Sequence, residues 1–438
     1  MMKTIRTAGV HPDRWFRLIP VLYFLFLLIV LWVFGYTPTN DGEGYIELAR
    51  DCMNYGEPYP CKVSIEGQPF IWNIGSINMV ILSLSLFGTI YPVLLLMCGM
   101  KALTAYFITG IARKVFSDKV ALITLLIYVL YPNYWGQSTT LLPEIPSEFF
   151  MFSAFYVIFS RQSRKMMVLA GVLLALSNWF RPNVALMIVL LSAWLFFFHR
   201  TVFLKKIPLV LTACIVSLAA IGTECYLRTG HFVFQAQTYW YNMVDQCYDG
   251  APAAPHFGMD TTSEGKSRYI KDREKKTCFE CNEIWKRRSI EWLRGHMAEY
   301  LGKIPPRLYY LYMNDIDNMA AFLADKENAE NNYVLIPYRH ILTEWNTLTP
   351  VQWFSFVTTL FYALIMLMAV AAFLVYAREG RLSYLSLPLV MAVAGSFIFV
   401  LLVHAETRYK DSFMPFIIMM SACFLAYLFR NRQSLENK

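Results

Sequence analysis

The stretch FRLIPVLYFLFLLIVLWVFGY, residues 16–36, decides the fold of this chain. It contains one charged residue, Arg17, and matches the roughly 20 residues that a helix needs to cross a bilayer. No small-residue cleavage site follows it, so the pattern is not that of a removable signal peptide. We therefore expect a first transmembrane helix that is retained.

The composition extends this expectation to the whole chain. Hydrophobic residues make up 57% of the 438 residues and charged residues only 16%, whereas soluble domains contain roughly 25% charged residues. A soluble core of this length could not hide so much apolar surface. The net charge of +8 is spread over short clusters between apolar runs. That distribution indicates membrane orientation, not a nucleic-acid-binding face.

Ten apolar runs are compatible with membrane-spanning helices. They cover residues 16–36, 91–112, 119–136, 144–160, 166–180, 183–199, 207–227, 352–377, 383–403 and 411–429. A further run at 70–87 is predicted to lie in the interface, because an eleventh crossing would place the later basic clusters outside, against the positive-inside tendency. The prediction is an all-α polytopic membrane protein of about ten transmembrane helices, with both termini cytoplasmic.

Two long segments face outward in this topology. The first, 37–90, contains an amphipathic stretch at 45–54 and the interfacial run. The second, 228–351, is the largest polar region, and its part 283–312 fits either helices along the interface or a solvated helical cap. The expected organisation is an N-terminal membrane module at 1–227 that includes the first loop, a large outward loop at 228–351, and C-terminal helices at 352–438.

Unusual polar residues from four parts of the chain fall on this same outer face. They are Asp41, Glu43 and Tyr45 after the first helix, Glu144 and Glu148 at the start of the fourth, Arg181 at the turn before the sixth, and His404, Glu406, Arg408 and Tyr409 after the ninth. Carboxylates and cations at one membrane face suggest a proton acceptor and a site for an anionic group.

Each of these residues also has an ordinary explanation. Glu144 and Glu148 suit the positive end of a helix dipole, and Asp41 and Glu43 suit a turn beside glycine. Arg408 suits an interfacial anchor. Arg181 is the most informative, because Pro182 is predicted to begin the sixth helix, whose free N–H groups would point outward beside the guanidinium. Such a pairing fits a phosphate group.

Nine cysteines are present, and five of them lie in the outward segments. Because Cys52 and Cys61 share a short loop, we predict that they form a disulfide. One further pair is expected among Cys247, Cys278 and Cys281, with the pairing left open. The CxxC spacing of Cys278 and Cys281 lacks the second ligand pair of a zinc site.

At the polar residues the sequence resembles the GT-C superfamily of membrane glycosyltransferases, the group of protein mannosyltransferases and aminoarabinose transferases. The resembling segments follow in family order and cover nearly the whole chain. They are Asp41-Gly-Glu-Gly-Tyr45 with Leu48-Ala49, Gln68-Pro69-Phe70 with Leu86-Phe87-Gly88, Ala112-Arg113-Lys114-Val115-Phe116, Leu142-Pro143-Glu144, Arg181-Pro182 and Glu406-Thr407-Arg408-Tyr409. Glycine follows Asp41 where the mannosyltransferase branch has a second acid, and Glu43 is the next acid along the chain.

The resemblance implies an inverting transfer of a sugar from a polyprenyl-phosphate donor to an acceptor glycan, lipid or protein, in the inner membrane of a bacterium. Asp41 would accept the proton of the attacking hydroxyl, with Glu43 as an alternative acid. Arg181 and Arg408, with His404, would stabilise the leaving phosphate. Glu144 would orient sugar or acceptor, as would Tyr45, Glu148, Glu406 and Tyr409. No cofactor is indicated, and a divalent metal ion stays open.

Two other functions compete with this prediction. A transporter or lipid flippase also needs polar residues in a helical bundle, and Lys101, deep in the second predicted helix, suits it, because intramembrane charges are functional by default. However, transporters usually carry their sites near the midplane and show paired halves. Lys101 could instead be a structural strut paired with a carboxylate. A non-catalytic member of the family is the third alternative.

Overall fold

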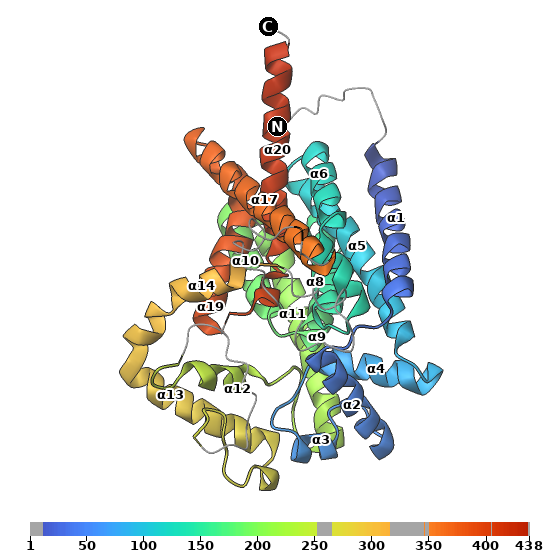
Figure 1. Cartoon of the computed structure of the whole chain (residues 1–438), viewed down its shortest axis with the longest axis vertical. Coiled ribbons are helices and arrows are strands. Elements are labelled where there is room, and N and C mark those ends of the chain that lie inside the picture. Colours follow the sequence, from blue (N-terminus) through green and yellow to red (C-terminus); the bar gives the residue numbers. More distant parts are fainter. Residues whose placement is uncertain (1–11, 252–264, 316–345, 347–349, 404, 437–438) are drawn as a thin grey trace.

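The computed structural model describes residues 12–251, 265–315, 346, 350–403 and 405–436. They form helices joined by turns and loops, and none of the described residues forms a strand. A bundle of helices makes up most of the molecule (Figure 1). Its members are α1 (Pro12–Phe34), α5 (Tyr91–Val115), α6 (Asp118–Val129), α8 (Glu144–Ser160), α9 (Arg164–Phe180), α10 (Val184–Phe198), α11 (Arg200–Thr229), α17 (Pro350–Arg378), α19 (Gly395–Leu402) and α20 (Met414–Glu436).

Several of these helices have the length and surface of membrane spans. Five helical segments in the described parts of the chain are long and apolar enough to cross a bilayer: Asp13–Phe34, Tyr91–Val115, Arg200–Thr229, Phe356–Arg378 and Leu382–Leu402. The outer face of α1 exposes Ile29 at 57% and Trp32 at 84%. Continuous exposed apolar faces of this kind are stable in lipid and aggregate in water. The chain is an integral membrane protein.

A sixth span arises if the bent pair Pro132–Thr139 and Glu144–Ser160, which meet at 118°, is taken as one. Length and composition therefore support five to six of the ten predicted spans. The others correspond to the shorter helices α6, α9 and α10 and to the apolar part Met414–Arg430 of α20.

The predicted span at 119–136 is wrong in one respect. The helix α6 ends at Val129, and the short helix α7 (Pro132–Gly136) begins a new direction, followed by the 3₁₀ turn η1 (Gln137–Thr139). Pro132 explains the break, because proline removes a backbone donor and disfavours the helical conformation of the residue before it. Tyr131 accordingly has extended backbone angles.

One end of the bundle gathers basic residues. There Arg113, at the end of α5, donates to Asp13 of α1 at 2.5 Å and to Asp118 of α6 at 2.7 Å. Lys206 of α11 donates to the backbone oxygens of Ile158 and Arg161, which close α8. Termini of α1, α5, α6, α8 and α11 thus meet at this end, where α20 also finishes (Figure 1).

The opposite end carries the described parts of the two segments that are predicted to face outward. Helix α2 (Asn40–Tyr55) starts at an N-cap, where Thr39 accepts from Gly42, and ends at Gly56 with φ +83°. Beside it lie α3 (Lys62–Gly67) and α4 (Ile74–Phe87), which runs across the direction of α1 and α5 (Figure 1). The second segment forms α12 (Tyr239–Met243), α13 (Cys278–Gly302) and α14 (Ile304–Tyr312).

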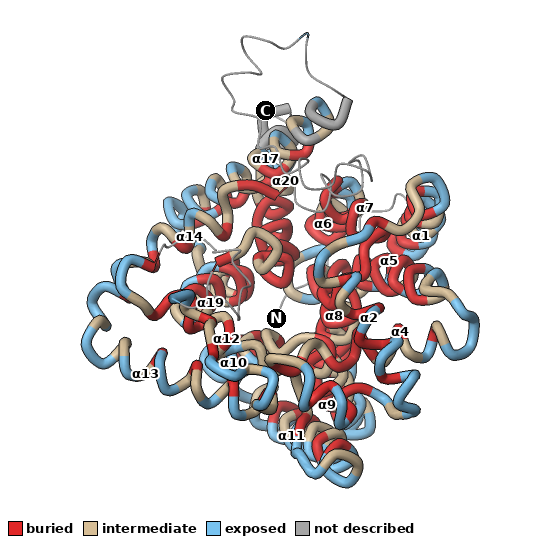
Figure 2. Tube along the Cα trace, turned by 60° about the horizontal axis from the view of Figure 1, so that its bottom comes forward, coloured by how far each residue is buried: buried red, intermediate tan, exposed pale blue. Residues whose placement is uncertain are grey.

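The helices differ in how far their residues are buried. Buried residues concentrate on α5, α8, α9 and α20, while α1, α11 and α13 turn exposed residues outward (Figure 2). The 3₁₀ turn η8 (Thr407–Lys410) lies between α19 and α20 and packs against α14. This turn brings the last polar motif of the sequence to the end of the bundle where α2 begins.

Candidate functional site

Asp41 stands in the first turn of α2, where a carboxylate also stabilises the positive end of the helix dipole. Gly42 lets this turn come close to the bundle, because an added Cβ would lie 2.8 Å from the hydroxyl of Tyr36 and 2.9 Å from that of Thr39. A larger residue would require one of these two side chains to move. Asp41 thus lies where the start of α2 comes close to Tyr36 and Thr39.

Arg408 joins Asp41 across 367 positions of sequence. Its Nη1 lies 2.5 Å from Oδ2 of Asp41, and its Nε lies 2.7 Å from Oε2 of Glu406. Burial opposes the charge of this guanidinium, but the two carboxylates outweigh it and raise the pKa of Arg408. One cation is thus shared by two acids, and the trio carries one net negative charge.

Arg181 forms the second ion pair of the site. It follows α9 in an extended conformation and donates through Nη1 to Oε1 of Glu144, the first residue of α8. The other oxygen of Glu144, Oε2, is buried and accepts no hydrogen bond from the residues that the structure describes. The carboxylate of Glu144 is therefore satisfied on one oxygen only by the described residues.

Tyr409 links the two ion pairs. Its ring centroid lies 4.9 Å from Cζ of Arg181 and 5.5 Å from Cζ of Arg408, both within cation–π range. Burial and the carboxylate of Glu406 raise the pKa of its phenol, so Tyr409 stays protonated at neutral pH. The cluster of Asp41, Arg408, Glu406, Arg181, Glu144 and Tyr409 is called the ion-pair site below.

The expected geometry of the Arg181 turn is only partly right. Helix α10 begins at Val184 after the N-cap Asn183, so Pro182 precedes the helix and does not start it. Asn183 does not cap α10 through its side chain, because its amide donates to the hydroxyl of Ser412 at 3.1 Å. The sequence predicts Arg181 beside the free N–H groups of a helix start. In the structure its guanidinium instead pairs with the carboxylate of Glu144.

Glu43 and Tyr45 lie on α2 close to Asp41. The hydroxyl of Tyr36 donates to Oε1 of Glu43 at 2.8 Å. Tyr45 is buried, and its hydroxyl accepts from the amide of Asn73 at 2.8 Å. Burial and the nearby Asp41 carboxylate raise the pKa of the Tyr45 phenol. Both residues are therefore neighbours of the ion-pair site, joined to it through the turn of α2.

Glu148 does not lie in the ion-pair site. It is 2% exposed inside the bundle, where Oε2 lies 3.4 Å from the ammonium of Lys101. His404 lies outside the residues that the structure describes. No group of three or more His, Cys, Asp or Glu residues within the described ranges could hold a metal ion.

Cys52 and Cys61 face each other at the other end of α2. Their sulfur atoms are 3.3 Å apart, and both are buried free thiols. The hydrogen bond from Cys52 lowers the pKa of the Cys61 thiol, aided by backbone N–H groups at the start of α3. Their predicted disulfide stays a prediction, and the pairing among Cys247, Cys278 and Cys281 stays open.

Four buried polar residues near Arg408 are not predicted from the sequence. They are Gln137, Asp411, Lys410 and Asp315, all 2% exposed or less. A usable signal existed for two of them, since Lys410 and Asp411 directly follow Arg408-Tyr409 at the start of a predicted span. Nothing in the sequence marks Gln137, whose importance depends on the neighbours that the fold supplies.

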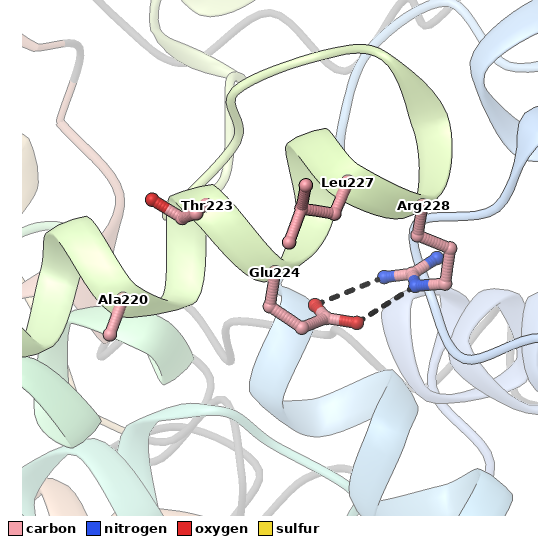
Figure 3. Close-up of a pocket in the computed structure, with 5 residues that line it drawn as sticks. All are labelled: Ala220, Thr223, Glu224, Leu227 and Arg228. Carbon is pink, nitrogen blue, oxygen red and sulfur yellow. Dashed lines mark hydrogen bonds and ion pairs between the residues drawn. The ribbon is translucent and has the colours of Figure 1, made fainter.

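A groove on α11 is separate from this cluster. It has a volume of about 640 Å³ and is lined by Ala220, Thr223, Glu224, Leu227 and Arg228 (Figure 3). Its two charged side chains are paired: Arg228 donates to Glu224 at 2.9 Å and also to the backbone oxygens of Pro58 and Pro60. These bonds tie α11 to the loop before α3, which is a structural role.

Comparison with known proteins found no matching family model, no matching curated protein and no matching solved structure. The residues of the ion-pair site are therefore the basis for assigning a function.

Proposed function

We propose that this chain is an integral membrane glycosyltransferase, which moves a sugar from a polyprenyl-phosphate donor to an acceptor on the extracytoplasmic side. The carrying observation is the contact of Asp41 with Arg408, next to Arg181 and Tyr409. A carboxylate beside two guanidinium groups combines a proton acceptor with stabilisation of a phosphate leaving group. The acceptor is a glycan, a lipid or a protein, and nucleic acid has no part.

The proposed topology has ten crossings and both termini in the cytoplasm of a bacterium. It is supported by the contacts that bring Arg113 and Lys206 to one end of the bundle, as the positive-inside tendency requires. In this topology α2, α3 and α4 lie outside, with α4 in the interface, where its exposed Leu86 and Phe87 contact membrane lipid.

In the proposed reaction the acceptor hydroxyl attacks the anomeric carbon of the donor sugar. Its proton passes to the carboxylate of Asp41 as the new carbon–oxygen bond forms. The bond between the anomeric carbon and the phosphate oxygen breaks, and its electron pair stays on the polyprenyl phosphate. Attack from the face opposite the phosphate inverts the anomeric centre.

The two arginines have different tasks in this reaction. Arg181 binds the donor phosphate, because its planar fork matches phosphate oxygens and its present partner Glu144 keeps a second acidic oxygen for a sugar hydroxyl. Arg408 turns from Asp41 toward the phosphate as charge develops there. This exchange leaves Asp41 without its cation, and an unpaired carboxylate is the stronger base.

A direct test measures the release of polyprenyl phosphate by purified protein in lipid nanodiscs. The substrates are polyprenyl phosphates that carry different labelled sugars, supplied with membrane extract as the source of acceptors. The proposal expects release with at least one sugar and the appearance of label in an inverted linkage. If label instead crosses the bilayer of proteoliposomes while the sugar–phosphate bond stays intact, the chain is a transporter and the proposal fails.

A further inference from the structure

A row of four buried polar side chains runs through the bundle directly behind the ion-pair site. Lys101 of α5 donates to Oε1 of Gln137 at 2.6 Å and to Oε2 of Glu148 at 3.4 Å. Gln137 of η1 then donates through Nε2 to Oδ2 of Asp411 at 2.7 Å. All four residues are 2% exposed or less. The row connects α5, α8 and η1 to the segment between η8 and α20.

Gln137 is chemically specific for its place in this row. The lysine ammonium only donates hydrogen bonds and the aspartate carboxylate only accepts them, so the bridge between them must accept at one end and donate at the other. An uncharged amide does both. Glutamate at position 137 would oppose Asp411 with a second carboxylate, and leucine would leave both charged groups without their common partner.

The row ends beside the turn that carries Arg408. Asp411 directly follows η8, three positions after the arginine. On the same turn Lys410 donates to the backbone oxygens of Asn314 and Thr407 and lies 2.7 Å from Asp315. Buried side chains therefore hold η8 from the inside, while its outer side chain, Arg408, reaches Asp41.

We infer that Lys101 and Gln137 are positioning residues of the proposed transferase: by holding Asp411, they hold η8 so that the guanidinium of Arg408 stands at Asp41. The expected effect on turnover depends on the proposed function. The mechanical link, by which Gln137 and Asp411 hold the turn that carries Arg408, does not depend on it. Displacing a catalytic group by about 1 Å can lower the rate about a hundredfold. The gain in rate from holding Arg408 in place therefore outweighs the cost of burying these charged side chains. This positioning role explains the buried charge of Lys101 without a transport pathway.

The kinetic test compares Gln137→Leu with Lys206→Met. Lys206 is a matched control, because it is also a buried lysine of the bundle, 5% exposed, but its ammonium binds carbonyl oxygens at the basic end. We expect Gln137→Leu to lower kcat for polyprenyl phosphate release about tenfold to a hundredfold with little change in KM. Lys206→Met should keep kcat. Equal kcat in wild type and Gln137→Leu would overturn the inference.

A rescue variant separates position from charge. Asp411→Asn keeps an oxygen that can accept from Gln137, whereas Asp411→Leu does not. We expect Asp411→Asn to retain most of the turnover that Asp411→Leu loses. If the two variants are equally inactive, the charge of Asp411 matters and its position does not, and the inference is wrong.

The mechanical link is tested without any activity, through melting temperatures. If Gln137 holds Arg408 against Asp41, Arg408→Ala should cost less in the Gln137→Leu background than in wild type, with a difference of at least about 2 °C. The combination of Arg408→Ala with Lys206→Met should be additive. If the effects of Gln137→Leu and Arg408→Ala on melting temperature are additive, the strut is wrong even if the protein is an active transferase. If they are not additive and the protein has no transferase activity, the strut is supported and the proposed function is wrong.

Discussion

At the scale of single residues, the balance of charge determines what the ion-pair site can do. Asp41, Glu406 and Glu144 face two arginines, so every guanidinium already has a carboxylate partner before any ligand arrives. A phosphate therefore has to compete with these acids for the cations. The exchange is favourable when the departing acid gains a proton, which is the task that the proposed reaction assigns to Asp41.

Asp41→Asn tests the base directly. The variant keeps the size of the side chain but cannot accept a proton, so turnover should fall at least about a hundredfold, the usual scale for losing a general base. Steady-state release of polyprenyl phosphate measures this. The matched control is Glu47→Gln, an exposed acid on the same helix, which should leave turnover unchanged. If Asp41→Asn transfers sugar at a near-normal rate while Glu43→Gln or Glu144→Gln is inactive, the inactive variant identifies the base and Asp41 is not the base.

Arg181→Ala should act on donor binding. Loss of a charge-assisted contact to phosphate raises the KM of the donor about tenfold or more. Because the substitution also leaves Glu144 buried without a cation, the double variant with Glu144→Gln serves as the control for stability. Arg181→Lys should recover only part of the affinity, since an ammonium cannot make the paired contact. A KM unchanged in all three variants would place the phosphate elsewhere.

The residue types of the ion-pair site could be predicted from sequence, but their pairings could not. Asp41, Arg181 and Arg408 are expected on one face because they follow the first, fifth and ninth predicted spans, which all end on the same side of the membrane. Which acid meets which arginine depends on side-chain packing, and no spacing rule encodes it. The same holds for Glu148, whose partner Lys101 lies on a different helix.

At the scale of elements, helix ends follow local chemistry closely. Thr39 caps α2 and Gly56 ends it, while Pro132 ends the run that hydropathy alone joins into one span. Pro182 is predicted to begin α10, but the helix begins at Val184, and the side chain of Asn183 donates to Ser412 of a distant segment. The contact with Ser412 has no signal in the local sequence.

The loop between α2 and α3 provides a prediction at this scale. We expect Cys52 and Cys61 to be oxidised in protein isolated from an oxidising compartment, because the sulfur atoms already face each other at 3.3 Å. Closing so short a loop would add roughly 2–3 kcal/mol to stability. Peptide mapping without reduction should show the linked pair, and Cys61→Ser should lower the melting temperature to that of the reduced protein. Two alkylated free thiols in such a map would contradict the disulfide.

At the scale of the whole molecule, composition predicts a helical membrane protein, and the five long apolar helices agree with it. The number of crossings is harder to predict, because α6, α9 and α10 are shorter than a perpendicular span requires. The described contacts of Arg113 and Lys206 bring two of the basic clusters to one end of the bundle, which supports the proposed ten-span topology.

The last prediction tests this topology with single cysteines and a maleimide reagent that does not cross membranes. The nine native cysteines are buried, so background labelling in intact cells should be low. The loop at 137–143 is buried as well, and exposed positions are therefore chosen: Glu47 on α2, Arg164 at the start of α9, and Lys275 before α13. Each is replaced by cysteine in turn.

Ten crossings predict that Glu47→Cys and Lys275→Cys react from outside, whereas Arg164→Cys reacts only after the membrane is opened. An eleventh crossing by α4 would reverse everything that follows it, so Arg164→Cys would react in intact cells and Lys275→Cys would not. Asp41 would then be divided by the bilayer from the Arg181 turn and the Arg408 turn. Since Arg408 contacts Asp41 at 2.5 Å, that topology cannot hold the ion-pair site together. The labelling pattern therefore tests the membrane arrangement and the existence of the site at once.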